Sequence, residues 1–244
     1  MNHAADDLQS IPQRLRVGSS VYEIHTKSGP KNTVLTYDDG PEPMGTTKVL
    51  EVLEERNATA TFFVLLSRTR ETPSIVGDIL SKGHEIGLHG LNHKSLRDMN
   101  SEEVFIRTYR AKQELEQLTG RPVRWFRPPY GHQTLETWKG VVRAGLLPVV
   151  WSVQCNDWED ARSEDYKQYL TEVEAIKFPG SIILAHDNFA SRMDEAADAP
   201  PPRFCRGRLA RLILDAVQER GFSCCSLENA IETGDLILKS WFRT

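Results

Sequence analysis

The feature that most constrains the fold is a regular alternation of strand-like and helix-like segments along the chain. Short apolar runs predict strands at residues 33–37, 59–66, 84–88, 123–126, 148–153, 181–185 and 221–227. Apolar residues at steps of three and four predict helices between them, at residues 46–56, 73–82, 101–119, 135–144, 165–176 and 209–219. Strands that alternate with helices pair in parallel, and no Pro/Gly-rich linker interrupts the pattern, which favours one α/β domain.

Composition narrows the classes of partner. The net charge is −4, so no basic field suggests binding to nucleic acid or to an anionic membrane surface. No apolar run is long enough to span a bilayer, and residues 1–16 lack the apolar core of a secretory signal. These features predict a cytoplasmic protein, unless a leader has been trimmed from the chain. The four cysteines match neither a zinc-finger pattern nor a disulfide framework, so we expect them to be reduced and structural.

Two polar clusters at the ends of strand-like runs indicate a metal site. Asp38 and Asp39 precede the turn-forming Gly40, and His89 and His93 follow the predicted strand at 84–88. A carboxylate with two histidines is the ligand set of a catalytic zinc centre, and the other acid is left to act as a base on the bound water. The spacing of the histidines predicts one side of a helical turn. Each cluster alone would have an ordinary structural explanation, but together they favour a metal site.

Three further motifs lie at predicted strand ends. They are Arg127-Pro128-Pro129-Tyr130-Gly131, Asn156-Asp157-Trp158 and Ile183-Leu184-Ala185-His186-Asp187. Taken singly, they suggest a rigid loop with a surface ion pair, an exposed acid beside a core tryptophan, and a satisfied polar histidine. Their common location favours a functional role, because the carboxyl ends of the strands carry the active site in a β/α barrel. The sequence therefore predicts a single, irregular β/α barrel.

In this order, the segments TYDDGP, HGLNH, RPPYG, NDW and ILAHD resemble the motifs of the polysaccharide deacetylase family, also called the NodB homology domain or carbohydrate esterase family 4. The resemblance covers roughly residues 31–231, and the ordered set is more specific than any one motif. It implies a distorted NodB-type barrel of about seven or eight β/α units. We expect that domain at residues 31–244, with residues 1–30 as an extension that packs on the barrel or leads into it.

The resemblance also implies an activity and a metal centre. The expected enzyme is a metal-dependent hydrolase that removes N-acetyl groups from oligo- or polysaccharides containing N-acetylglucosamine, with a chitooligosaccharide favoured. Asp39, His89 and His93 would hold one divalent ion, usually Zn²⁺, with Co²⁺ or another divalent ion as alternatives. Asp38 would be the general base, held by Arg127.

The remaining roles follow from the same resemblance. His186 would be the general acid, oriented by Asp157. The backbone N–H of Tyr130 would help to stabilise the oxyanion. Trp158 and Leu184 would wall the acetyl methyl group. The expected partner is an N-acetylated carbohydrate or a small acylated substrate.

The chain departs from the family pattern at several motif positions. Gly90 stands where Ser or Thr usually follows the first histidine, so we expect a hydrogen bond that supports the metal loop to be missing. Gln154 stands where the fourth motif usually begins with Asp, and Tyr37 replaces Phe. None of these changes removes a metal ligand, the base or the acid, so we expect an active enzyme.

Residues 188–206 are polar and Pro-rich, which predicts either a cover over the substrate groove or a mobile surface excursion.

Other functions stay open from the sequence. The same ligands would suit a two-His-one-carboxylate iron oxygenase, but that reading leaves Asp38, Arg127 and His186 without roles. Hydrolysis of another amide C–N bond, in a formamide, a cyclic amide or ureide, or a small acylated metabolite, would use the same site. A non-catalytic sugar-binding relative would keep the groove, although the intact acids and histidines argue against it.

Overall fold

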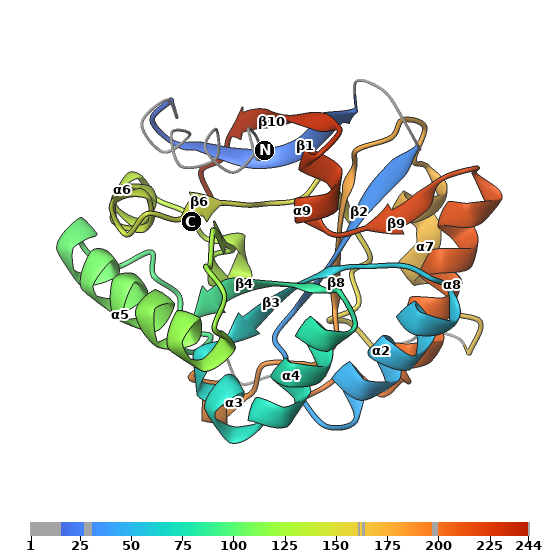
Figure 1. Cartoon of the computed structure of the whole chain (residues 1–244), viewed down its shortest axis with the longest axis horizontal. Helices are drawn as coiled ribbons and strands as arrows, with labels where there is room; N and C mark the ends of the chain where they lie inside the picture. The colour runs from blue at the N-terminus through green and yellow to red at the C-terminus, as the bar shows by residue number, and fades with distance from the viewer. Residues whose placement is uncertain (1–15, 27–30, 161, 163, 197–199, 244) are drawn as a thin grey trace.

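The structure is a computed structural model that describes residues 16–26, 31–160, 162, 164–196 and 200–243. Among these residues, an eight-stranded parallel sheet runs in the order β6-β5-β4-β3-β2-β8-β7, with β9 paired to β2. The strands are β2 (Asn32–Asp38), β3 (Thr61–Leu65), β4 (Glu85–Gly90), β5 (Trp125–Phe126), β6 (Leu147–Pro148), β7 (Val153–Gln154), β8 (Ile182–His186) and β9 (Ser223–Cys225). The sheet curls strongly into a half-barrel (Figure 1), which confirms the predicted α/β class and distorted barrel.

Most helices cover the outer side of the curled sheet (Figure 1), whereas the last one, Leu227–Ile231, contributes Leu227 and Ala230 to the core inside the curl. The helices are α2 (Gly45–Glu55), α3 (Leu66–Glu71), α4 (Pro73–Ser81), α5 (Ser101–Thr119), α6 (Leu135–Arg143), α7 (Lys167–Glu174), α8 (Arg206–Glu219) and α9 (Leu227–Ile231). Each predicted helix has a counterpart, whereas α3 and α9 were not predicted. Asn100 and Glu103 form a capping box at the start of α5, and the left-handed Gly120 ends that helix. None of the helices that the structure describes combines the length and the apolar character needed to cross a membrane.

Both faces of the sheet are buried, as expected for parallel strands. Val34 of β2 belongs to a core inside the curl, while the next residue, Leu35, belongs to a core under the helices. Phe62 and Phe63 of β3 divide between the two cores in the same way. This double burial explains why the strands appear in the sequence as continuous apolar runs.

The predicted strand at 148–153 is wrong as a single element. The structure has two short strands there, β6 at one edge of the sheet and β7 at the other. The residues between them cross the gap between these two edge strands, which we call the seam of the half-barrel. There Val149 bridges to Val21, and the Ser152 N–H donates to the carbonyl oxygen of Ile182. The apolar run is therefore continuous in sequence because nearly all of it is buried, although its backbone changes partners.

Two strands outside the main sheet were not predicted. β1 (Ser19–Thr26) and β10 (Gly234–Ser240) pair antiparallel and cross the upper edge of the molecule in Figure 1. Backbone hydrogen bonds connect β1 to Val150, after β6, and to Gly180, before β8, so β1 lies along the seam. The predicted division at residue 30 stays a prediction, and residues 1–15 and 27–30 lie outside the described residues.

Candidate active site

A cavity of about 390 Å³ opens at the carboxyl ends of the strands. Every predicted site residue lines it except Arg127 and Asp157, which are buried behind it. The lining side chains come from β2, β4 and β8 and from the loops after β5 and β7, which are far apart in sequence and neighbours in the sheet. The structure thus brings the predicted residues together at the predicted rim.

The two adjacent acids share the cavity because the backbone turns between them. Asp38 is the last residue of β2, and Asp39 follows with a φ of 75°. This left-handed conformation breaks the strand alternation that would point the two side chains to opposite faces. Gly40 then passes close to the residue after β8, since a Cβ at this position would meet Oδ2 of Asp187 at 2.2 Å.

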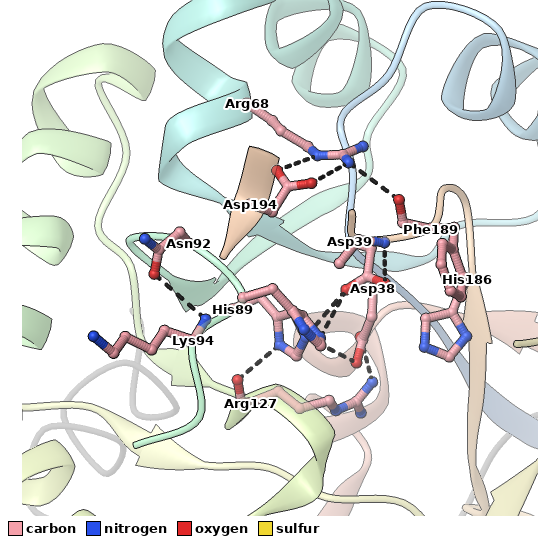
Figure 2. Close-up of polar contacts among 12 residues, drawn as sticks. Asp38, Asp39, Arg68, His89, Asn92, Lys94, Arg127, His186, Phe189 and Asp194 are labelled. Carbon is pink, nitrogen blue, oxygen red and sulfur yellow. Dashed lines mark hydrogen bonds and ion pairs between the residues drawn. The ribbon is translucent and has the colours of Figure 1, made fainter. Parts of the chain in front are cut away.

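Asp39, His89 and His93 are buried, and among the described residues their ligand atoms lie within 4.8 Å of one another. Oδ1 of Asp39 lies 3.4 Å from Nε2 of His89 and 3.3 Å from Nε2 of His93. Nδ1 of His89 lies 2.8 Å from the carbonyl oxygen of Arg127, so Nδ1 carries the proton and Nε2 presents its lone pair (Figure 2). Burial lowers the pKa of His93 to about 4, which keeps this imidazole neutral at pH 7.

These three residues fit a divalent cation. Oδ1 of Asp39 is buried and accepts no hydrogen bond from any residue that the structure describes, a costly state for a carboxylate oxygen unless a cation meets it. One carboxylate oxygen and two neutral imidazole nitrogens are suitable ligands for Zn²⁺ and for neighbouring divalent metals. Oδ2 of Asp39 accepts the backbone N–H of Ala190 at 3.0 Å, which fixes the orientation of the carboxylate.

The predicted helical turn under the histidine pair is wrong. β4 continues through His89 to Gly90, and His93 follows on an irregular bend. Gly90 has a φ of 128°, and a Cβ there would lie 2.9 Å from the carbonyl oxygen of Asn92, so the backbone itself requires glycine. The Asn92 side chain accepts a hydrogen bond from Arg107, which supports the loop.

Arg127 holds Asp38 from beneath the cavity. Its Nη1 donates to Oδ1 of Asp38 at 2.8 Å and to Oγ1 of Thr36 at 2.7 Å, and its other nitrogens donate to two backbone carbonyl oxygens. Burial lowers the pKa of Arg127, and the charge of Asp38 opposes that shift. Because Oδ1 of Asp38 is taken, Oδ2 faces the metal ligands, 3.9 Å from Nε2 of His89. This oxygen is available to accept a proton.

His186 and Asp157 form the second ionised pair of the site. Nδ1 of His186 lies 2.7 Å from Oδ1 of Asp157, and the His186 backbone N–H donates to Oδ2 at 2.8 Å. Although burial alone would lower the pKa of His186, the charge of Asp157 raises it to about 9. Arg206, at the start of α8, donates to Oδ2 of Asp157 at 2.9 Å. Arg206 belongs to none of the motifs, so sequence reasoning missed it.

The other predicted residues form the walls of the cavity. Tyr130 has a φ of 61°, and its ring packs edge-on against His93 at 4.3 Å between centroids. Trp158 is 38% exposed at the mouth, and its ring lies edge-on to His186 at 5.9 Å. Leu184 is buried on β8 beside them. These side chains give the cavity apolar surface beside His93 and His186.

The remaining departures from the family pattern have structural explanations. Oε1 of Gln154 accepts a hydrogen bond from the indole N–H of Trp151 at 3.1 Å. Because Trp151 lines the cavity, Gln154 helps to hold a side chain of the cavity wall. Tyr37 is buried and stacks on Phe62 at 5.3 Å between centroids, within the core under the helices. Neither residue alters a predicted ligand.

The segment after His186 is tied to the metal ligands. The carbonyl oxygen of Asp194 accepts the His93 backbone N–H at 2.7 Å. Arg68 of α3 binds both oxygens of the Asp194 carboxylate, at 2.8 and 2.6 Å, and donates to the carbonyl oxygen of Phe189 at 3.1 Å (Figure 2). Phe189, Ala190 and Ala196 line the cavity, so the described part of the 188–206 segment shapes the groove; residues 197–199 lie outside the described residues.

We expect Arg68→Ala to lower the free energy of unfolding by about 2 kcal/mol, because it leaves the buried carboxylate of Asp194 without its cation. Zinc affinity should fall with it, since the same segment positions Ala190 and His93. Thermal unfolding and zinc titration measure both effects. Arg70→Ala is the matched control on the same helix: its pair with Glu114 is exposed and contributes less than about 1 kcal/mol. Equal effects of the two substitutions would contradict this role for Arg68.

Known proteins resemble the chain over most of its length. The family model for polysaccharide deacetylase matches residues 25–149. A chitooligosaccharide deacetylase of Azorhizobium caulinodans is 40% identical over 192 residues, which cover 78% of this chain and 89% of the relative. A peptidoglycan-N-acetylglucosamine deacetylase of Bacillus cereus is 33% identical over 175 residues, which cover 70% of this chain and 62% of the relative.

Solved structures agree with these matches. The crystal structure of a peptidoglycan N-acetylglucosamine deacetylase superposes with a TM-score of 0.72 at 26% identity, covering 88% of this chain and 94% of that one. A carbohydrate esterase family 4 pseudoenzyme from Bacillus anthracis superposes with a TM-score of 0.72 at 22% identity, covering 95% of this chain and 75% of that one, which supports the fold alone. By its motifs, its curled sheet and these matches, the chain belongs to the polysaccharide deacetylase family, carbohydrate esterase family 4.

Proposed function

We propose that the protein is a metal-dependent deacetylase that removes N-acetyl groups from oligosaccharides containing N-acetylglucosamine, with a chitooligosaccharide as the favoured substrate. The observation that carries the proposal is the meeting, in one cavity, of the Asp39, His89 and His93 cluster with two separately held acid–base groups, Asp38 and His186. The similarity to chitooligosaccharide deacetylases over most of both chains supports the substrate class.

The metal that we propose is Zn²⁺, with Co²⁺ or another divalent ion as alternatives. Asp39, His89 and His93 would hold it. When bound, such an ion polarises the acetamide carbonyl and lowers the pKa of a water molecule. The other groups of the chain perform the proton transfers and orient the substrate.

The proposed base, Asp38, and the proposed acid, His186, are held by different partners. Oδ2 of Asp38 accepts the proton of the attacking water, while Arg127 keeps Oδ1 in place. Nε2 of His186 donates a proton to the amine nitrogen as the C–N bond breaks, because Nδ1 is bound to Asp157. Acetate and the free amine are the products. The charge of Asp157 holds His186 in the protonated form that a general acid requires.

The walls of the cavity orient the acetyl group. We propose that the backbone N–H of Tyr130 donates to the carbonyl oxygen as negative charge develops on it, which stabilises the transition state more than the ground state. Trp158 and Leu184 would flank the acetyl methyl group with apolar surface. The partly exposed Trp158 also offers a flat ring to a sugar at the mouth.

Metal binding and acetate release together test the proposal. Protein stripped with a chelator should bind one Zn²⁺ by calorimetry and regain acetate release from N-acetylated chitooligosaccharides when Zn²⁺ is restored. His93→Gln should lower zinc affinity by more than the 10- to 100-fold that is typical when only a residue supporting a ligand is changed, because it removes a ligand. His132→Gln is the matched control, because His132 lines the same cavity outside the cluster.

Two outcomes would contradict the proposal in different ways. Equal zinc affinity in both variants would remove the proposed ligand set. Zinc binding without acetate release from any N-acetylated oligosaccharide would refute the sugar deacetylase and move the search to formamides, cyclic amides and small acylated metabolites.

A further inference from the structure

The loop that carries Tyr130 is held from outside by the segment that follows β10. The indole N–H of Trp241 donates to the carbonyl oxygen of Gly131 at 3.0 Å. Gln133 and Arg243 exchange two backbone hydrogen bonds, at 2.9 and 3.1 Å. The Gln133 side chain donates to the carbonyl oxygen of Trp241 at 2.7 Å. Residues 241–243 are therefore bonded to both ends of the segment 131–133.

The loop needs such support because its backbone is strained. Tyr130 and Gly131 are consecutive left-handed residues, with φ of 61° and 64°. Side chains other than glycine rarely adopt this conformation, and it persists only where the surroundings hold it. Within the loop, the N–H groups of Gly131 and His132 donate to Pro128 and Pro129. These short-range bonds leave the Gly131 carbonyl to Trp241.

Trp241 also contacts the loop indirectly, by packing against a second tryptophan, Trp151. Its ring lies 5.3 Å from that of Trp151, at an angle of 59°. Trp151 in turn packs directly on Gly131, where a Cβ would meet its ring at 2.6 Å. Trp151 and Gly131 line the cavity, but Trp241 is not among the described residues that do. Trp241 therefore contacts the loop outside the lining of the cavity, although Arg243 of the same segment lines it.

We propose that Trp241 is a positioning residue for catalysis: it holds the Tyr130–Gly131 backbone so that the Tyr130 N–H is already in place when the oxyanion develops. This inference rests on the proposed function. A donor stabilises an oxyanion best when it needs no rearrangement at the moment of reaction. A loop that relaxes in part would weaken that contact in the transition state and leave ground-state binding unchanged.

Trp241→Phe tests the inference, because it keeps an aromatic ring against Trp151 and removes the N–H that Gly131 accepts. Complete loss of an oxyanion donor costs about 10²- to 10³-fold in kcat, so partial misplacement should lower kcat by about tenfold. KM and zinc affinity should stay at the wild-type values. Hydrogen exchange at the amides of Gly131, His132 and Gln133 should become faster.

Trp138→Phe is the matched control. The indole of Trp138 is also buried and donates to a backbone carbonyl oxygen, that of Ser19, at 2.8 Å. Its loss should lower the melting temperature to a similar degree. It should change neither kcat nor exchange at residues 131–133, because Trp138 lies on α6 and does not contact the loop carbonyl.

The outcomes separate this inference from the proposed function. If wild-type protein loaded with zinc releases no acetate from the chitooligosaccharides, the proposed function fails and the catalytic role of Trp241 fails with it. If the wild type is active but Trp241→Phe and Trp138→Phe have the same kcat, or exchange at residues 131–133 is unchanged, the inference alone is overturned. A rise in KM without a fall in kcat would also overturn it, since that is the signature of lost substrate binding.

Discussion

Replacing Asp38 by Asn should lower kcat by about a thousandfold, within the range of 10² to 10⁴ that a positioned general base contributes. Asparagine keeps an oxygen that can accept the hydrogen bond from Nη1 of Arg127, so the geometry of the pair survives. It cannot accept the proton of the attacking water. Zinc stoichiometry should remain at the wild-type value, because the proposed ligand is the neighbouring Asp39. Acetate release and calorimetric zinc titration measure the two properties separately.

The same substitution should reduce stability. Arg127 is fully buried, and Asp38 is its partner in an ion pair of 2.8 Å. Leaving this guanidinium without a carboxylate should lower the free energy of unfolding by about 3 kcal/mol. Activity must therefore be compared at a temperature at which both proteins are folded, as judged by circular dichroism.

Asp187→Asn provides the matched control for the loss of activity. Asp187 is also buried, yet it does not line the cavity and instead accepts a hydrogen bond from Thr46. Burial raises the pKa of Asp187 to about 7, so an uncharged side chain is already populated at neutral pH. This variant should retain a kcat close to that of the wild type. A fully active Asp38→Asn protein would show that another group accepts the proton.

The positions of the site residues could be predicted because strand ends are readable in the sequence. Asp38 ends β2, His89 lies near the end of β4 and His186 ends β8. Parallel strands of one sheet bring their carboxyl ends to the same edge, so an apolar run followed by a polar motif is enough to place the side chain. The spacing of the histidines was misleading, because it matches a helix although β4 continues to Gly90.

The supporting residues could not be predicted, because nothing local marks them. Arg68 and Asp194 are 126 residues apart, and neither belongs to a motif. Arg206 binds Asp157 and Trp241 binds Gly131 through hydrogen bonds that depend on the path of whole segments. Strands β1 and β10 could not be predicted either, because they pair with each other outside the main sheet. β10 is also largely exposed, so it has no continuous apolar run.

The second large effect that we expect is on the pH dependence of kcat/KM, through the proposed general acid His186. The pKa of His186 is raised to about 9, so kcat/KM should hold through neutral pH and fall as His186 loses its proton. The same shift affects stability. A histidine whose folded pKa exceeds its unfolded value stabilises the fold fully below about pH 6.5. That contribution is lost as the pH rises through about 9.

Asp157→Asn should move the basic limb of the pH–rate profile to lower pH by about one to three units, because it removes the charge that raises the pKa of His186. Arg206, which loses the carboxylate that its Nη1 binds, acts in the same direction because its charge is no longer balanced. At pH 8 the variant should therefore lose about 10- to 100-fold in kcat/KM, and part of that loss should be recovered at lower pH.

The difference between variant and wild type is the diagnostic quantity, because a cation bound at Asp39 repels the imidazolium in both proteins and shifts both profiles alike. Asp160→Asn is the matched control: Asp160 is an exposed acid a few residues along the same loop, and it should leave the basic limb in place. If Asp157→Asn also leaves the limb in place, the titrating group is not His186. The proton for the leaving amine would then have to come from elsewhere in the cavity.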